Sequence, residues 1–236
     1  MRTTLGTRLD DPPLLAVYHA LLAAWGPQGW WPARTQLEMM IGAILTQNTA
    51  WTNVEQALAN LKRARMLRVA ALHDAGVEAI ATLIRPAGTF TVKARRIKHF
   101  IDWLVEQYGG DIPRLFRGDT AEIRTALLSV HGIGPETADC MLLYAGHHPV
   151  FVVDAYTRRF MERHDWAAPR EPYDALAARF TRALAAVPAS ERVLAYNEYH
   201  ALIVALAKRH CRTRPDCATC PLRSWLPAHP HGKVPS

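Results

Sequence analysis

The sequence predicts an all-α fold. Apolar residues recur at helical intervals of three and four in many segments, and capping residues precede several of these segments. Sustained alternation of apolar and polar residues, which would indicate strands, is not found. Half of the 236 residues are apolar. This is enough material for the core of one large domain or two small ones.

In the first third of the chain, glycines, prolines and capping residues separate the predicted helices. The first helix opens at residues 10–12 and runs to Trp25. Thr35 with Glu38 forms a capping box for a second helix, which ends in the polar stretch 46–49. A second box is expected at Thr52, paired with the glutamate three residues later, and starts a helix that ends at residue 61.

The helical pattern continues to the C-terminal region. A helix over residues 92–108 is expected to stop at Gly109-Gly110. Asp119 with Glu122 caps the helix that follows. Further helices are predicted over residues 77–84, 155–164, 172–187 and 191–210.

The segment 127–160 carries the strongest functional pattern. It contains the sequence HGIGP, with Gly132 and Gly134, between two helical patterns. The two glycines allow a sharp turn and expose backbone N–H groups at the start of the next helix, which is a favourable seat for a phosphate. Asp154 follows a short apolar run at 149–153. The pattern therefore predicts a phosphate-binding turn followed by a single carboxylate.

The charge balance favours a polyanionic partner such as DNA. The formal net charge is +7 and the pI is about 9.5, and arginine carries most of the positive charge. No apolar run approaches the roughly 20 residues that span a bilayer. The N-terminal residues lack the apolar segment of a signal peptide. We therefore expect a cytoplasmic, nucleoid-associated protein without a membrane partner.

Three of the four cysteines lie close together near the C-terminus, as Cys211, Cys217 and Cys220. In a reducing compartment such a group indicates metal binding before disulfide formation. The fourth, Cys140, stands alone in a predicted helix and is expected to be a small core residue.

The segment 127–160 resembles the helix-hairpin-helix and Gly/Pro-Asp segment of the endonuclease III superfamily of DNA glycosylases, and the similarity extends from residue 37 to residue 222. The resemblance implies a six-helix barrel domain at residues 34–146 and a second domain formed by 1–33 and 147–236. It implies that double-stranded DNA with a damaged base lies across the cleft between the domains. It also implies that Asp154 is the catalytic carboxylate, which stabilises positive charge on the sugar. The alternative role of Asp154 is a helix N-cap, and the two roles are compatible.

Glu136 distinguishes two reaction types within this family. Members that also cut the DNA backbone carry a lysine at this position, two residues after the second glycine of the hairpin. Here the position is Glu136, and no lysine occurs between Lys98 and Lys208. The resemblance therefore implies a monofunctional enzyme without AP lyase activity. Glu136 either lines the base pocket or stabilises the first turn of its helix.

The tryptophans Trp30, Trp31 and Trp51 are candidates for the base pocket. The Trp-Trp-Pro turn, together with Glu at the lysine position, resembles the 3-methyladenine subgroup. An alkylated purine is cationic and stacks well between aromatic rings. The alternative for these side chains is core packing. Gln47, beside Asn48, resembles the residue that fills the hole left by a flipped base; the alternative is an ordinary polar residue at a helix end.

Further residues are candidates for DNA contacts without chemistry. Gly132 and Gly134 are expected to bind phosphate through their amides, and Arg158 is a candidate helper. The remaining basic candidates are Arg159, Lys93, Arg95 and Arg96. A basic run of this kind is more often a solvated helix face.

The C-terminal cysteines resemble the cluster loop of the same family, in which four cysteines hold a [4Fe-4S] cluster. Here Leu226 stands where the fourth cysteine is expected. The sequence leaves open a labile cluster with a missing fourth ligand, a cluster with a substitute ligand such as His229 or His231, a zinc site, or no metal.

The main hypothesis is a monomeric DNA glycosylase that releases an alkylated purine. One alternative is the removal of oxidised or mismatched pyrimidines by the same Asp154 chemistry. A second alternative is a non-catalytic DNA-damage-binding protein, because helix-hairpin-helix units also occur in proteins that only hold DNA.

Overall fold

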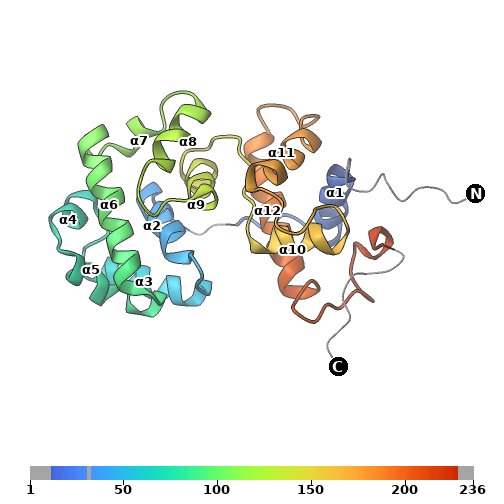
Figure 1. The fold of residues 1–236 in the computed structure, drawn as a ribbon, viewed down its shortest axis with the longest axis horizontal. Helices are drawn as coiled ribbons and strands as arrows, with labels where there is room; N and C mark the ends of the chain where they lie inside the picture. The colour runs from blue at the N-terminus through green and yellow to red at the C-terminus, as the bar shows by residue number, and fades with distance from the viewer. Residues whose placement is uncertain (1–11, 31–32, 228–236) are drawn as a thin grey trace, which may run out of the picture. The chain divides into compact units, whose positions relative to one another are not determined.

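The computed structural model describes residues 12–30 and 33–227, and within them every regular element is helical. The predicted all-α class is thereby confirmed. The chain divides into two compact units (Figure 1). One unit consists of residues 31–149, and the other of residues 1–30 with 150–236.

The unit 31–149 is built around α2 (Gln36–Thr46) and α6 (Phe90–Tyr108). Every residue of α2 from Leu37 to Leu45 is buried, and α6 packs against α2 and three shorter helices (Figure 1). The other elements are α3 (Trp51–Arg63), α4 (Val69–Asp74), α5 (Val77–Leu83), η1 (Arg85–Ala87), α7 (Ile112–Leu115), α8 (Thr120–Leu128), α9 (Pro135–Cys140) and the π-helical turn η2 (Met141–Ala145).

Local signals explain several helix ends in this unit. Oγ1 of Thr35 accepts a hydrogen bond from N of Glu38 at 3.1 Å, as the capping box predicts. Asp119 caps α8 through the N–H groups of residues 121 and 122. Gly109 ends α6 in the left-handed conformation, with φ +68°. These three predictions are confirmed.

The second predicted capping box is wrong. Helix α3 begins at Trp51, and Ala50 occupies the N-cap in an extended conformation. The preceding polar residues form a turn, closed by a hydrogen bond from N of Thr49 to O of Thr46 at 3.0 Å. The chain therefore enters the helix early and places Thr52 inside its first turn. The short helices α4 and α7 have no counterpart in the sequence prediction.

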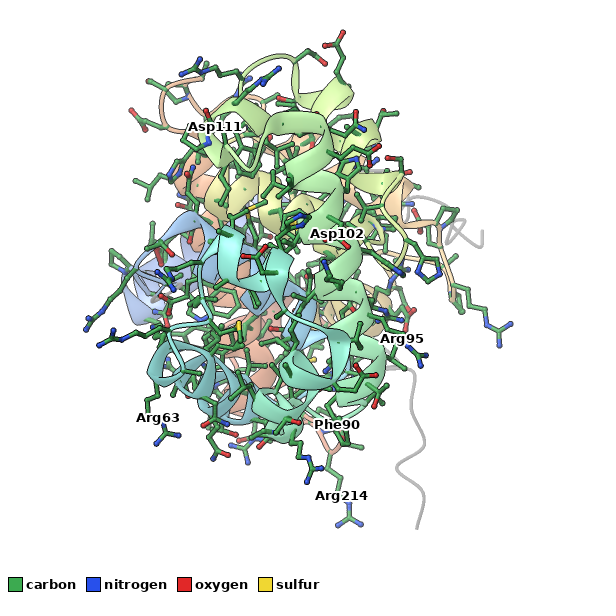
Figure 2. The ribbon with its side chains drawn as sticks, turned by 90° about the vertical axis from the view of Figure 1, so that its left-hand side faces the viewer. Arg63, Phe90, Arg95, Asp102, Asp111 and Arg214 are labelled. Carbon is green, nitrogen blue, oxygen red and sulfur yellow. The ribbon has the colours of Figure 1, made fainter. Side chains whose placement is uncertain are left out.

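Lys93 also departs from expectation, because its side chain is a core element and only 1% of it is exposed. Its ammonium group donates to O of Leu45 at 2.8 Å, to O of Ala87 at 2.7 Å and to Oγ1 of Thr49. It thus ties α6 to the end of α2 and is not a surface contact for phosphate. Arg95, two residues later, is exposed and extends away from the ribbon (Figure 2).

The other unit is organised around α12 (Arg192–Arg209), against which α1 (Leu14–Trp25) and α10 (Ala155–Arg163) pack (Figure 1). The remaining elements are α11 (Tyr173–Ala183) and η3 (Arg223–Trp225). Phe151 and Phe180 stack with ring centroids 3.9 Å apart in its core. Among the described residues, no helix combines the length and apolar character needed to cross a membrane.

Candidate active site

The hairpin between α8 and α9 has the geometry expected of a phosphate-binding turn. Gly132 adopts φ +94°, a conformation that favours glycine, and N of Ile133 bonds back to O of Val130 at 3.0 Å. Gly134 is exposed and forms the N-cap of α9, followed by Pro135. The amides at the start of α9 are therefore placed at an accessible helix N-terminus.

Gln47 is held by the hairpin. Its Nε2 donates to Oγ1 of Thr137 at 2.9 Å and to O of Gly132 at 3.2 Å, and its Oε1 accepts from Arg96. Gln47 is the C-cap residue of α2, so these bonds join the end of α2 to both sides of the turn. Asn48 follows in the left-handed conformation with φ +53° and is exposed.

Asp154 occupies the N-cap of α10 and uses one carboxylate oxygen for the cap. Oδ1 accepts from N of Thr157 at 2.7 Å and from Oγ1 of Thr157 at 2.8 Å. Oδ2 faces α12, where Nε2 of His200 lies 3.4 Å away. The carboxylate side chain is 14% exposed. The cap therefore occupies one oxygen and leaves the second for other contacts.

The surroundings of Asp154 keep it ionised. Burial raises the pKa of this carboxyl, but His200 and the two hydrogen bonds from Thr157 outweigh it and hold the pKa below its usual value. A carboxylate that stays negative while partly buried suits the stabilisation of positive charge on a neighbouring group.

Trp30 belongs to the same unit and contacts the same histidine. Its ring lies 5.3 Å from the imidazole of His200, centroid to centroid, at an angle of 55°. Of the predicted pocket tryptophans, Trp31 lies outside the described residues. Trp51 is the first residue of α3 and is half-buried. Of the predicted pocket residues, Trp30 is thus the one that contacts His200, the residue beside the Asp154 carboxylate.

Three other residues that the sequence analysis singled out, Glu136, Arg158 and Cys140, lie on α9 and α10. Glu136 is exposed in the first turn of α9, where the helix dipole stabilises a negatively charged side chain. Arg158 is half-buried and donates to O of Glu171 at 2.6 Å, so it is engaged within its own unit. Cys140 is buried at the end of α9.

Sequence reasoning missed His200, Thr157 and Thr137, which hold Asp154 and Gln47. Thr157 had a signal, because a hydroxyl three residues after an N-cap aspartate is within reach of its side chain. His200 had a weaker one, since a lone imidazole in an apolar helix needs a polar partner. Nothing in the sequence links Thr137 to Gln47.

The C-terminal cysteines do not form a four-thiolate site. Cys211 is buried, and its Sγ accepts from Nη1 of Arg163 at 3.2 Å. Burial and the neighbouring thiols raise the pKa of Cys217 and of Cys220. Within residues 12–30 and 33–227, no three His, Cys, Asp or Glu side chains form a group suited to a metal ion. Leu226 supplies no ligand, and His229 and His231 lie outside the described residues. The described residues therefore do not fit a [4Fe-4S] cluster with four cysteine ligands.

Comparison with known proteins places this geometry in a family. The family model of the HhH-GPD superfamily base excision DNA repair proteins matches residues 41–186, which contain the hairpin and Asp154. The chain belongs to this superfamily. A putative DNA repair glycosylase of Methanocaldococcus jannaschii is 41% identical over 211 residues, covering 89% of this chain and 93% of the relative. Endonuclease III of Escherichia coli K12 is 28% identical over 184 residues, covering 78% and 79%.

Solved structures of HhH-GPD relatives share the fold. The 3-methyladenine DNA glycosylase MagIII of H. pylori, bound to 1,N6-ethenoadenine, matches with a TM-score of 0.73 and 27% identity, over 83% of this chain and 97% of that one. A non-covalent endonuclease III–DNA complex matches with a TM-score of 0.74 and 20% identity, over 89% and 92%. These matches confirm the predicted fold of the superfamily.

Proposed function

We propose that this HhH-GPD protein is a monofunctional DNA glycosylase, which hydrolyses the N-glycosidic bond of a damaged base and leaves the strand intact. The proposal rests on the carboxylate of Asp154, whose two oxygens contact different partners. Oδ1 is fixed by Thr157, while Oδ2 lies 3.4 Å from Nε2 of His200 on a side chain that is 14% exposed. Such a group is fixed in position and negatively charged, as the stabilisation of a positively charged sugar requires.

The chemistry follows from that carboxylate. As the bond to the base breaks, the sugar develops oxocarbenium character, and a fixed negative charge nearby lowers the free energy of this state. A water molecule then attacks C1′, and Asp154 is placed to orient it. The base must first leave the helical stack, which costs a few kcal/mol and favours weakened or damaged pairs.

The lack of a lysine nucleophile supports the monofunctional reaction. The first turn of α9 carries Glu136, whose carboxylate forms no Schiff base with an abasic sugar. No lysine occurs in the sequence between Lys98 and Lys208. The product of the proposed reaction is therefore an abasic site that breaks only on treatment with alkali.

An alkylated purine is the favoured substrate. Trp30 contributes an aromatic face in the unit of Asp154, and a cationic purine gains from stacking on such a face. The 27% identity to MagIII over 97% of that chain supports this choice. A second candidate, the oxidised or mismatched pyrimidines, is supported by the 28% identity to endonuclease III.

The hairpin is the proposed anchor on double-stranded DNA. The backbone N–H groups of Gly134 and of the residues after Pro135 lie at an exposed helix start, and the chain has a net charge of +7. We propose that the protein acts as a monomer on duplex DNA. Light scattering of the free protein and of its DNA complex would test this stoichiometry.

The proposal is tested by a base-release screen. Duplexes that contain a methylated purine, ethenoadenine, thymine glycol or a G·T mismatch are incubated with the protein, with and without later alkali. We expect release from the alkylated duplexes, strand breaks only after alkali, and loss of release in Asp154→Asn. The asparagine keeps an oxygen that can accept the cap from Thr157, so the variant removes charge with little change in shape.

The screen separates the alternatives. Release confined to thymine glycol or the mismatch would establish the second candidate substrate class. Unchanged release in Asp154→Asn would overturn the catalytic assignment. Tight binding to a damaged duplex without release from any member of the panel would instead establish a non-catalytic damage-binding protein.

The cysteine loop is outside this reaction. Metal analysis and visible absorbance of anaerobically purified protein decide between an iron–sulfur cluster, zinc and no metal. An intact [4Fe-4S] cluster would need a fourth ligand beyond Cys211, Cys217 and Cys220. A Cys217→Ser variant with unchanged base release would confirm that the loop has no part in the chemistry.

A further inference from the structure

His200 is a buried polar residue in an apolar stretch of α12. It is 3% exposed, and Ala201, Leu202 and Ile203, which follow it, are buried as well. Removing an imidazole from water is costly unless it gains a polar partner. Packing alone would favour an aliphatic side chain at this position, so a buried histidine here is expected to have a polar partner nearby.

Oδ2 of Asp154 supplies that reason, 3.4 Å from Nε2 of His200. The carboxylate approaches from the N-cap of α10, and α10 packs against α12. The indole of Trp30 also contacts the imidazole, with ring centroids 5.3 Å apart. The imidazole therefore contacts both an aromatic ring and the carboxylate.

The bonds of Asp154 show what such a contact does. Both hydrogen bonds from Thr157 reach the same oxygen, Oδ1. They fix that oxygen, but they leave the second one without a donor from α10. From α12, Nε2 of His200 approaches Oδ2 to 3.4 Å. Each carboxylate oxygen accepts more than one hydrogen bond, so Oδ2 can contact His200 and still face a sugar or a water.

We propose that His200 is a positioning residue for the glycosylase reaction, and that its Nε2–H group holds Oδ2 of Asp154 in the orientation and charge state required for catalysis. This inference rests on the proposed function and assigns a role to a residue outside the hairpin and Gly/Pro-Asp segment. His200 acts through Asp154 and makes no contact of its own with the reacting atoms.

The other charged side chains in the same turns of these two helices are directed elsewhere. Arg158 and Arg159 of α10 each donate to a backbone carbonyl, at 2.6 Å and 2.8 Å. Glu198 of α12 accepts from backbone N–H groups of residues 28 and 29. Tyr18 of α1 lies near Glu198. Burial raises the pKa of Tyr18 most, and the charge of Glu198 raises it further. Among the described groups, His200 is thus the titratable side chain that faces Oδ2 of Asp154.

The electrostatics of Asp154 agree with this role. Burial raises the pKa of Asp154, and the contact with His200 is the largest of the effects that lower it. Without the imidazole, only the hydrogen bonds from Thr157 would counter the rise in the pKa of Asp154 that burial causes. The pKa of Asp154 then rises, and a higher pH is needed to ionise it.

The test compares His200→Phe with His200→Gln. Phenylalanine keeps a ring next to Trp30 and removes the donor, whereas glutamine restores an N–H donor on a flexible side chain. The substrate is duplex DNA treated with dimethyl sulfate, or a thymine-glycol duplex if the screen favours pyrimidines. Single-turnover release is measured across the acid and neutral pH range, together with DNA affinity and thermal unfolding.

We expect His200→Phe to reduce release at neutral pH by about tenfold or more, as is usual when a supporting contact of a catalytic group is lost. The acid limb of its pH profile moves to higher pH, while DNA affinity is unchanged. His200→Gln recovers most of the rate and the normal acid limb. A carbon-13 titration of the Asp154 carboxyl shows the same shift without reference to activity.

Two outcomes would overturn the inference. One is a folded His200→Phe protein with the rate and pH profile of the unmodified protein. The other is an equal loss in both variants without movement of the acid limb, which would indicate packing alone. Asp154→Asn is run in parallel. If it also retains release, the proposed function itself fails; if it abolishes release while His200→Phe keeps the rate and pH profile of the unmodified protein, only the role of His200 fails.

Discussion

The side-chain amide of Gln47 donates a hydrogen bond to Oγ1 of Thr137 at 2.9 Å. Together with the contacts to Gly132 and Arg96, this bond fastens the end of α2 to the hairpin. The resemblance implies that Gln47 enters the DNA duplex when a base leaves it. Insertion would require Gln47 to give up these bonds first.

Replacement of Gln47 measures the strength of this attachment. Gln47→Ala removes three polar contacts in a half-buried position, and we expect the free energy of unfolding to fall by about 1 to 2 kcal/mol. Gln47→Glu loses the Nε2 donations to Gly132 and Thr137, but it keeps the oxygen that accepts from Arg96 and lets the Thr137 hydroxyl donate to the new carboxylate, so its loss should be smaller. Urea unfolding of both variants checks this order. Equal stability of all three proteins would show that the contacts contribute nothing.

Gly132 and Gly134 are predicted to respond differently to alanine. Gly132 has φ +94°, and an added Cβ would clash with Cγ of Arg96 and lie 2.9 Å from its Cδ. We expect Gly132→Ala to cost about 1 to 3 kcal/mol of stability, because the backbone is strained and Arg96 must move. At Gly134, φ is −96° and the same Cβ meets no atom within 4 Å. Gly134→Ala should therefore unfold at the same urea concentration as the unmodified protein.

Glu136→Lys tests whether the missing nucleophile alone separates this chain from backbone-cutting relatives. A lysine amine at this position can form a Schiff base with the opened sugar, and elimination then breaks the strand. We expect strand breaks without alkali and a covalent DNA adduct that borohydride traps. Glu136→Gln is the matched control and should show base release without either signal. Absence of the adduct in a Glu136→Lys protein that still releases bases would contradict the assignment.

Lys93 predicts a specific dependence of stability on pH. Burial, followed by the charge of Arg96, lowers the pKa of Lys93 from 10.5 to about 8. Between these values the unfolded chain binds the proton and the folded chain does not, so the contribution of Lys93 to stability increases with pH. Lys93→Met lacks this increase and leaves O of Leu45 and O of Ala87 without their donor.

The measurement for Lys93 is urea unfolding of both proteins at several pH values. At pH 7 we expect Lys93→Met to be less stable by about 2 to 4 kcal/mol, because buried carbonyls lose a charged donor. The difference should widen as the pH rises from 8 towards 10.5. A constant difference across this range would mean that Lys93 titrates normally in the folded protein.

Elements with strong local signals were predicted well from the sequence. Thr35, Asp119 and Gly109 act on their nearest backbone groups, so the residue type and its offset were sufficient. Helices 155–164 and 191–210 were predicted within one or two residues of α10 and α12. The box at Thr52 failed because the polar turn before it, and not the threonine, determines where α3 begins.

Contacts between distant parts of the chain were beyond the reach of sequence patterns. Asp154 was found because it follows the hairpin at a characteristic spacing, but its partner His200 lies on a different helix. The run at 93–96 looked like one basic face. In the structure Lys93 enters the core and Arg96 contacts Gln47, while Arg95 remains exposed (Figure 2). Residues that are neighbours in one basic run therefore take different environments in the folded protein, which the composition of the run does not predict.

Two arginines of α10 hold the start of the C-terminal loop, and one of them also contacts Sγ of Cys211. Arg159 donates to O of Cys211 at 2.8 Å, and Arg163 donates to O of Arg212 at 2.6 Å and O of Thr213 at 3.1 Å. A segment anchored in this way tolerates the loss of a cysteine without losing its place. The position of residues 211–213 therefore rests on arginine contacts with α10 and does not require a metal ion.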